Sequence, residues 1–275
     1  MGCFQELATD PFVLFCVSCI IIPPVVEGMN REAIVAYAFH YTFLFTAALI
    51  AAVYWFTKSG ETVTLSKCDR WKARWYLLNG AVIHILLDGM TGVHKLNPTF
   101  ARQYAEIDGR YGAALGSFEG SAVHVISALE LYVYGPMCLW LYYLYHRGLP
   151  QRDALEFATC IAQLYGTIVY AGQEIISGMT LTQCDRNLTF SMAMLKNFWF
   201  AFVLGNTIWV IIPSWLGYEA WNRLVAASDM NQAPPKKREP KGKVSDDEDS
   251  DEGEASTPSR KKSTRNATPT RRRKA

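Results

Sequence analysis

The chain has 275 residues, of which 50% are hydrophobic, and its formal net charge at pH 7 is only +2. The apolar residues come in long runs rather than in alternating patterns, which excludes an ordinary soluble domain. HExxH, paired CxxC, GxGxxG and P-loop motifs do not occur, and this argues against a metallohydrolase, a nicotinamide oxidoreductase or an ATP-driven pump. We therefore expect an all-α, polytopic helical membrane protein that needs no cofactor and no bound metal.

Five apolar stretches are long enough to cross a bilayer, whose hydrocarbon core takes about 20 helical residues. A shorter run at 11–26 is interrupted near its end by two prolines, so it is a sixth span, a re-entrant piece or an interfacial helix. The sequence thus predicts a bundle of five membrane helices, or of six if the first run also crosses. The five predicted spans cover residues 33–56, 75–93, 122–145, 154–176 and 198–215.

The composition changes abruptly after Ser228. From Met230 onward, 13 Lys and Arg outnumber 8 acidic residues and aliphatic residues are almost absent. Such a segment cannot bury enough apolar surface to offset its chain entropy, so we expect residues 225–275 to form a disordered tail. Its basic clusters could attract anionic lipid head groups or act as a nucleic-acid or import patch, but on a multi-span protein we favour a cytoplasmic retention and solubilising tail. Ser245 and Ser250 lie in an acidic block typical of phosphorylation sites.

Before this tail we distinguish an N-terminal segment at 1–32, a first span with its loop at 33–71, and a membrane domain of four helices at 72–224. Lys and Arg accumulate between the first two long spans, in the 146–153 loop and in the tail. Because basic loops stay on the cytoplasmic side, this pattern predicts a multi-pass protein with a cytoplasmic C-terminal tail.

Polar residues stand inside the apolar runs. His84 and Asp88 lie four residues apart in the stretch GAVIHILLDG, so one face of a helix presents both. A charged side chain near mid-bilayer costs at least about 2.5 to 3.5 kcal/mol and is a functional hypothesis by default. Since an imidazole and a carboxylate shift each other's proton affinity in a dry pocket, the pair is a candidate proton donor and acceptor.

Further polar residues occur in the other runs. Each taken singly could be a hydrogen bond between packed helices, whereas together they suggest a polar pocket inside the bundle. Glu130, an acid in the 122–145 span, is the third catalytic candidate. The residues expected to line the pocket are Ser127, Tyr165, Glu174, Asn206 and Trp209. For His40, His124 and the loop residue Glu119 we prefer a structural role, as a capping or interfacial side chain.

The order of these features resembles the emopamil-binding protein family, which shares the four-span EXPERA domain and includes sterol Δ8–Δ7 isomerase, a non-isomerising relative and the sigma-2 receptor. The matching stretches follow the family order over residues 72–224. They are GAVIHILLDG, YAEIDGRY, YGPMCLW, QLYGTIVY and GNTIWVIIP. The resemblance implies five membrane helices in the endoplasmic reticulum, around a sterol pocket that opens to the bilayer.

For the sterol isomerase, the resemblance implies a reaction that protonates the double bond at C9, passes through a carbocation at C8 and removes a proton from C7. His84 and Asp88 then become the proton-transfer pair. Asn206 becomes a positioning group, and Trp209 the ring that stabilises the cation by cation–π interaction. Tyr111, which closes the YAEIDGRY motif, joins the expected substrate-binding residues.

The chain departs from the family pattern at its acids. Asp88 stands where the isomerase has Glu. Ser127 occupies the position of the family's second carboxylate, while Glu130, about one turn later on the same face, stands where the isomerase has Thr. Thr167 likewise replaces an acid that some members carry. Either the second acid has moved by a turn or isomerisation has been lost.

The leading hypothesis is a sterol isomerase of the endoplasmic reticulum membrane that relocates a proton without cofactor, in sterol biosynthesis. The alternatives are a non-catalytic protein that binds sterol or another lipid, an isomerase of a non-sterol polycyclic terpenoid, and a scaffold whose tail is the active part. The expected partners are a sterol or other polycyclic lipid and membrane lipid, with no nucleic acid. The oligomeric state is open, and a homodimer is one option.

Overall fold

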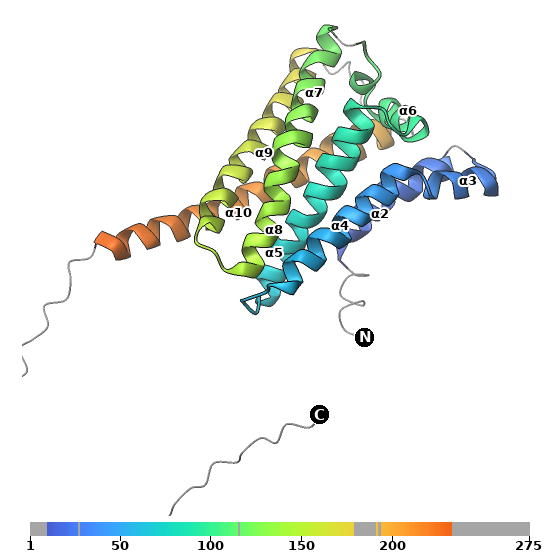
Figure 1. Ribbon diagram of the computed structural model, residues 1–275. Helices are drawn as coiled ribbons and strands as arrows, with labels where there is room; N and C mark the ends of the chain where they lie inside the picture. Colours follow the sequence, from blue (N-terminus) through green and yellow to red (C-terminus); the bar gives the residue numbers. More distant parts are fainter. Residues whose placement is uncertain (1–9, 27, 115, 179–190, 192–193, 233–275) are drawn as a thin grey trace, which may run out of the picture. The chain divides into compact units, whose positions relative to one another are not determined.

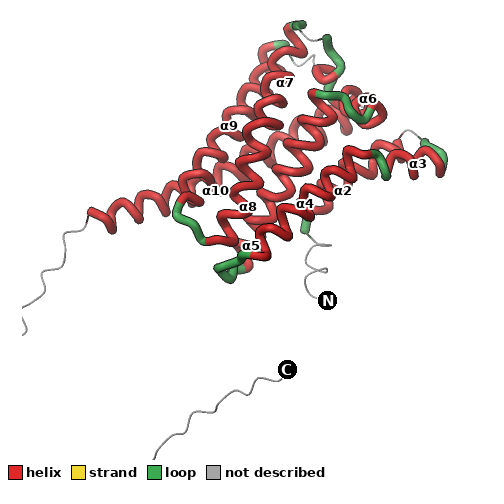
Figure 2. Tube along the Cα trace, in the orientation of Figure 1, coloured by secondary structure: helices red, strands yellow, loops and turns green. Residues whose placement is uncertain are grey.

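A computed structural model describes residues 10–26, 28–114, 116–178, 191 and 194–232. The described residues are helical with short connections and contain no strand (Figure 2), so the predicted all-α membrane bundle is confirmed. The elements are α2 (Pro11–Val26), α3 (Arg31–Ala38), α4 (Tyr41–Ser59), α5 (Lys67–Leu78), η1 (Asn79–Val93), α6 (Pro98–Ile107), η2 (Gly109–Tyr111), α7 (Phe118–Leu129), η3 (Glu130–Tyr134), α8 (Gly135–Arg147), α9 (Gln151–Ile176), η4 (Met194–Leu204) and α10 (Gly205–Gln232).

Four helical rods in the described part of the chain are long and apolar enough to cross a membrane. They are Tyr41–Ser59, Lys67–Val93, Gly120–Arg147 and Gln151–Ile176. The predicted span at 198–215 lies within the helical stretch that η4 and α10 form together. The short run at 11–26 folds as the single helix α2 through both prolines.

The predicted span at 33–56 is wrong in its first part. The chain breaks between α3 and α4, and His40 caps the second helix: its Nδ1 accepts from the backbone N–H of Thr42 at 3.4 Å. A side-chain cap of this kind satisfies an orphan N–H at a helix start, so the apolar run divides into a short helix and a span. The structural role expected for His40 is thereby confirmed.

The rod made of α5 and η1 is the centre of the bundle. In its most apolar window 78% of the residues are buried, against 22% for α4 and 33% for α9. Helices α4, α7 and α8 pack on this rod, and α9 packs on α8 and α10 (Figure 1). Because these helices surround α5 and η1, polar groups on η1 such as His84 and Asp88, which are 1% and 6% exposed, are shielded from their surroundings.

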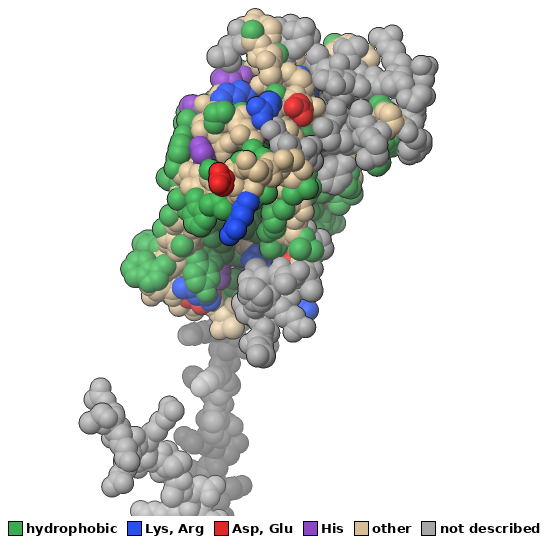
Figure 3. Space-filling model, turned by 90° about the vertical axis from the view of Figure 1, so that its right-hand side faces the viewer, with side chains coloured by type: hydrophobic (Ala, Val, Ile, Leu, Met, Phe, Trp, Pro, Cys, Tyr) green, Lys and Arg blue, Asp and Glu red, His purple; other side chains and the backbone are tan. Residues whose placement is uncertain are grey.

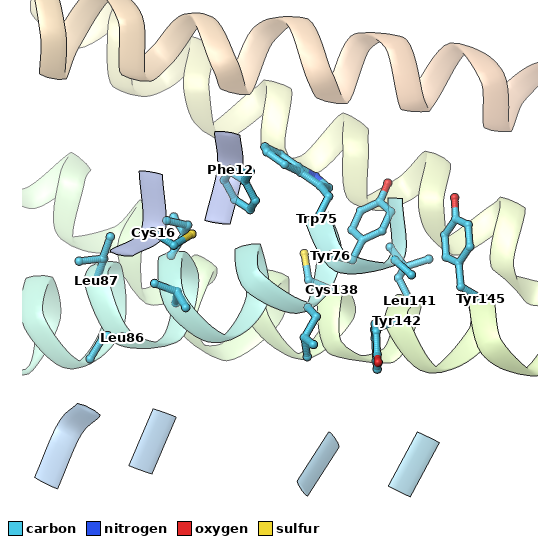
Figure 4. Packing of buried hydrophobic residues seen from close by; sticks show 14 of the residues in the cluster. Phe12, Cys16, Trp75, Tyr76, Leu86, Leu87, Cys138, Leu141, Tyr142 and Tyr145 are labelled. Carbon is cyan, nitrogen blue, oxygen red and sulfur yellow. The ribbon is translucent and has the colours of Figure 1, made fainter. Parts of the chain in front are cut away.

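The apolar core surrounds the same rod. The Phe12 ring of α2 packs at a tilt against Trp75 of α5, with ring centroids 4.2 Å apart. Cys138 and Leu141 of α8 are fully buried beside Tyr76 (Figure 4). On the face drawn in Figure 3, hydrophobic side chains form broad areas and charged ones stand apart. Exposed residues such as Trp55 and Ile168, 73% and 67% accessible, suit contact with lipid.

Two loops that we predict to lie on one side of the membrane meet in the structure. The Thr62 hydroxyl donates to the backbone oxygen of Arg147 at 2.9 Å, and His146 Nδ1 donates to Glu61 at 2.8 Å. At this end Arg223 of α10 donates to Asp153 of α9 at 2.8 Å. Helix α10 continues to Gln232, past the tail start predicted at 225, and most of the predicted tail lies outside the described residues.

Candidate active site

The candidate catalytic residues sit on two stretches of unusually wide helix. η1 and the short η3 are π-helical, with hydrogen bonds from residue i+5 back to residue i, such as His94 N–H to Gly89 oxygen at 2.9 Å. π-helical turns are rare and frequently occur at functional sites. Here η1 carries His84 and Asp88, and η3 begins at Glu130.

His84 and Asp88 form a hydrogen-bonded pair in the interior. The His84 Nδ1 to Asp88 Oδ2 distance is 3.3 Å, and the two residues are 1% and 6% exposed. The edge of the His84 ring faces Tyr134, with centroids 6.1 Å apart. His84 and Asp88 therefore lie on one face of the helix, as their spacing of four residues predicts.

Glu130 completes a cluster of three titratable groups. One ligand atom from each of His84, Asp88 and Glu130 lies within 4.8 Å of the other two. An imidazole and two carboxyls at this separation can exchange a proton directly or through one water. Imidazole nitrogen and carboxylate oxygen are also ligands that Zn²⁺ accepts, so these three residues could hold such an ion, and the metal-free site expected from the sequence stays a prediction.

Two tyrosines from the segment after η1 close over the carboxylates. The Tyr104 hydroxyl of α6 donates to Asp88 Oδ1 at 2.9 Å. The Tyr111 hydroxyl is hydrogen-bonded to Ser127 Oγ at 3.2 Å, and the two tyrosine rings lie 4.4 Å apart. Ser127 thus contributes a hydroxyl beside Tyr111, while Glu130, one turn later, supplies the carboxyl.

Burial and then the nearby Asp88 carboxylate raise the pKa of Tyr104 and of Tyr111 well above the ordinary value. Both phenols consequently keep their protons at any physiological pH. They are therefore present as hydroxyl groups, which can donate and accept hydrogen bonds.

The motif Asp108-Gly-Arg110-Tyr111 holds this segment in place. Arg110, 2% exposed, donates to both carboxylate oxygens of Asp108 at 2.7 to 3.0 Å, and its Nη1 donates to the backbone oxygen of Tyr170 at 2.9 Å. The guanidinium also lies 3.8 Å from the centroid of the Tyr170 ring, and the Tyr170 hydroxyl donates to Asp108. This buried, bidentate pair fastens η2 to α9 and so positions Tyr111.

The other predicted substrate-binding residues lie elsewhere. Tyr165 is 62% exposed on the outside of α9, whereas Glu174 is fully buried near the end of that helix. The Asn206 amide donates to its own helix, to Phe202 oxygen at 2.5 Å. Trp209 packs in an aromatic group with Trp75, at 6.0 Å between ring centroids. Their binding roles stay predictions.

The comparisons with known proteins point the same way. Residues 111–220 match the family model described as EXPERA (EXPanded EBP superfamily). The chain is similar to the probable 3-beta-hydroxysteroid-Delta(8),Delta(7)-isomerase of Oryza sativa subsp. japonica. The two are 25% identical over an alignment that covers 67% of this chain and 81% of that protein. It is also similar to the 3-beta-hydroxysteroid-Delta(8),Delta(7)-isomerase of Cavia porcellus, with 24% identity over 68% of this chain and 80% of that protein.

These matches support the resemblance of this chain to the emopamil-binding protein family. The chain is also similar to the isomeliandiol synthase of Melia azedarach, with 27% identity over 65% of this chain and 80% of the relative. The sequence family therefore includes proteins named for sterol chemistry and others named as plant terpenoid synthases.

Two residues of the cluster were missed from the sequence. Tyr104 and Gln163 are the first residues of the motifs YAEIDGRY and QLYGTIVY that carry the resemblance to the emopamil-binding family. Gln163 of α9 donates from Nε2 to His84 Nε2 at 3.1 Å. Their place in those motifs was the available signal, but the partner of each became visible only when the helices were packed together.

Proposed function

We propose that this chain is a sterol isomerase that moves a ring double bond from Δ8 to Δ7. The observation that carries the proposal is the cluster of the buried His84 and Asp88 with the half-buried Glu130, whose ligand atoms lie within 4.8 Å of one another. The names of two similar proteins, one from rice and one from guinea pig, support it: the first is a probable 3-beta-hydroxysteroid-Delta(8),Delta(7)-isomerase and the second a 3-beta-hydroxysteroid-Delta(8),Delta(7)-isomerase.

The reaction needs an acid and a base in one water-poor pocket. A proton is added at C9, the resulting carbocation at C8 loses the proton at C7, and the double bond moves by one position. A positioned acid and base each contribute typically about 10²- to 10⁴-fold. Exclusion of water protects the reactive cation from side reactions, and the burial of η1 in the bundle supplies this condition.

The hydrogen bonds divide the two carboxyls by role. Asp88 accepts from the His84 ring at Oδ2 and from the Tyr104 hydroxyl at Oδ1, and donors of this kind favour a carboxylate. Two carboxylates so close in a low dielectric cannot both be charged without a large cost. In this proposal Glu130 therefore carries the proton and donates it to C9, and Asp88 accepts the proton from C7.

The site is reset by return of a proton from Asp88 to Glu130 through water that exchanges with bulk solvent between turnovers, so the proton next given to C9 comes from solvent. The carboxyl oxygens of Asp88 and Glu130 fall within the 4.8 Å spread of the cluster, so one water or a small side-chain movement bridges them. This assignment also accounts for the shifted acid: the carboxyl at Glu130 serves the role for which the isomerase pattern uses the position of Ser127.

A polycyclic terpenoid alkene is the second candidate substrate. Similarity to the isomeliandiol synthase, at 27% identity, favours it as much as the sterol relatives favour a sterol. The same acid and base would serve either substrate, because both readings require protonation of a ring alkene.

The test is expression in cells that lack sterol Δ8–Δ7 isomerase, with the ratio of Δ8 to Δ7 sterols measured by mass spectrometry. We expect wild type to restore Δ7 sterol. We expect Asp88→Asn and Glu130→Gln to lower conversion at least about 100-fold, because each removes one proton-transfer group. Glu61→Gln makes the same chemical change in a loop and should convert like wild type.

A wild-type protein that is folded and in the membrane but leaves Δ8 sterol unchanged would contradict the sterol assignment. Binding of sterol without conversion would then favour the non-catalytic alternative. Conversion of a plant triterpenoid alkene under the same conditions would favour the second substrate.

A further inference from the structure

Gln163 reaches the cluster from α9, on the side of the His84 ring away from Asp88. Its side chain is 3% exposed, and its amide nitrogen lies 3.1 Å from His84 Nε2 and 3.7 Å from Cys138 Sγ. The Thr167 hydroxyl donates to the backbone oxygen of Gln163 at 2.9 Å. The side-chain amide therefore contacts both the His84 ring of η1 and Cys138 of α8.

This contact determines which ring nitrogen carries the proton. An amide nitrogen only donates, so the His84 Nε2 that faces it must accept. A neutral imidazole has a single N–H, which then lies on Nδ1, 3.3 Å from Asp88 Oδ2. Gln163 thus directs the one N–H of neutral His84 toward the carboxylate.

The other end of the amide fits the charged state of the ring. Gln163 Oε1 is buried and has no hydrogen-bond partner among the described residues. The last torsion of a glutamine side chain is broad and roughly two-fold, so a half-turn exchanges oxygen and nitrogen. The oxygen then accepts from Nε2–H of an imidazolium. An amide can satisfy both charge states, whereas a carboxylate can satisfy only a protonated Nε2.

We propose that Gln163 is a positioning residue that selects the Nδ1–H tautomer of His84. The consequence for turnover rests on the proposed function. The tautomer itself is a property of the resting protein and can be measured without substrate.

The first measurement is ¹⁵N NMR of the full chain, labelled at histidine and held in detergent micelles at pH 8. The chain has five histidines, and the His84 signals are assigned by their loss in His84→Gln. We expect a protonated Nδ1 and an unprotonated Nε2. In Gln163→Glu the new carboxylate can only accept a hydrogen bond, so His84 Nε2 must carry a proton to pair with it. The ¹⁵N chemical shift of Nε2 should therefore move to the value of a protonated ring nitrogen.

Gln151→Glu, the same change on the exposed first residue of α9, is the matched control and should leave the His84 signals unchanged. Unchanged signals from the other four histidines show that a variant is folded. Should Gln163→Glu not fold, Gln163→Met keeps the volume without the amide, and a mixture of tautomers is expected. A wild-type His84 with its proton on Nε2, or no response to either Gln163 variant, would overturn the proposal.

The second measurement is the conversion rate of the purified protein across pH. We expect Gln163→Glu to lower kcat about 10- to 100-fold, as small misplacements of catalytic groups do, with KM little changed and an altered pH profile. If wild type does not isomerise but carries the His84 proton on Nδ1, the proposed function fails and the positioning role stands. If wild type isomerises with the proton on Nε2, the positioning role alone fails.

Discussion

At the scale of single residues, Asp88 is held from two sides. His84 donates to one carboxylate oxygen and Tyr104 to the other, at 3.3 and 2.9 Å. The first contact follows from a spacing of four residues on one helix, so it could be predicted from the sequence. The second joins α6 to η1 across a loop, and no local pattern specifies which of the 14 tyrosines would make it.

The contribution of Tyr104 can be measured with Tyr104→Phe. A hydrogen bond to a charged group is worth about 1.5 to 3 kcal/mol, so the loss of this donor should lower kcat about 10- to 100-fold in the conversion assay on purified protein. Tyr132→Phe is the control, because the Tyr132 hydroxyl contacts the exposed His94 and lies outside the cluster. Equal rates for Tyr104→Phe and wild type would show that Tyr104 does not orient Asp88.

At the scale of helices, the cluster depends on the close approach of two rods. A Cβ on Gly80 would lie 2.9 Å from the backbone oxygen of Gly135 and 3.0 Å from Cys138 Cβ. Backbone atoms of packed helices cannot move aside as a side chain can. The glycine thereby lets η1 lie against the start of α8, next to the turn of η3 that carries Glu130.

Gly80→Ala is therefore expected to destabilise the protein by about 1 to 3 kcal/mol, the usual cost of overpacking, and to lower conversion by separating Asp88 from Glu130. Gly172→Ala on α9 is the matched control, since a Cβ there meets nothing within 4 Å and alanine favours helix by about 1 kcal/mol. Thermal unfolding in detergent measures both. If the two variants have the same midpoint, the close approach at Gly80 does not limit the packing.

We expect the loop between α4 and α5 to lose stability in acid. Hydrogen bonds from Lys58 and from His146 lower the pKa of Glu61 below its ordinary value of 4.5. A lowered folded-state pKa contributes stability that is present above about pH 4.5 and is lost as the pH falls through the folded value. Because the group is mostly exposed, the effect is local.

Hydrogen exchange of residues 57–66, corrected for the intrinsic dependence on pH, should therefore rise as the pH falls from about 5.5 to about 3.5 in wild type. Glu61→Gln cannot titrate and should show no such step. A step of equal size in Glu61→Gln would mean that another group loosens the loop.

The helices also show what hydropathy can and cannot predict. Long apolar runs indicate spans because a bilayer requires them. Helix α9 begins three residues before the predicted start at 154 and ends as predicted at Ile176. The break at His40 was not predicted, since the run is apolar on both sides and only the cap marks the boundary. The π-helical turns of η1 and η3 were not predicted either, because their sequence pattern is that of an ordinary apolar helix.

At the scale of the whole molecule, a buried rod of α5 and η1 carries the polar groups, and the surrounding helices keep lipid and water away from them. Another buried acid, Glu156 of α9, accepts from Tyr76, Tyr145 and Arg223 at 2.5 to 3.1 Å. This network ties α10 to the bundle far along α9 from Gln163. Composition and hydropathy predicted the class of the fold, whereas the pairing of rods required the three-dimensional structure.

The described helices belong to one compact unit that ends at Ala233. Truncation after Gln232 should therefore leave kcat and KM for conversion within about twofold of wild type, because no residue of the cluster lies beyond that point. The measurement is the conversion assay on the truncated and full-length proteins. Loss of activity in a truncated protein that is folded would favour the alternative in which the tail is the active part.

In the proposed reaction, His84, Asp88 and Glu130 move a proton on a ring alkene. The most direct test is incubation of the purified protein with a Δ8 sterol in D₂O, followed by mass spectrometry and NMR of the product. We expect a Δ7 sterol with one deuterium at C9 for wild type, and at least about 100-fold less of it for Glu130→Gln. Recovery of unlabelled Δ8 sterol from folded wild-type protein, or equal deuterium transfer by Glu130→Gln, would contradict it.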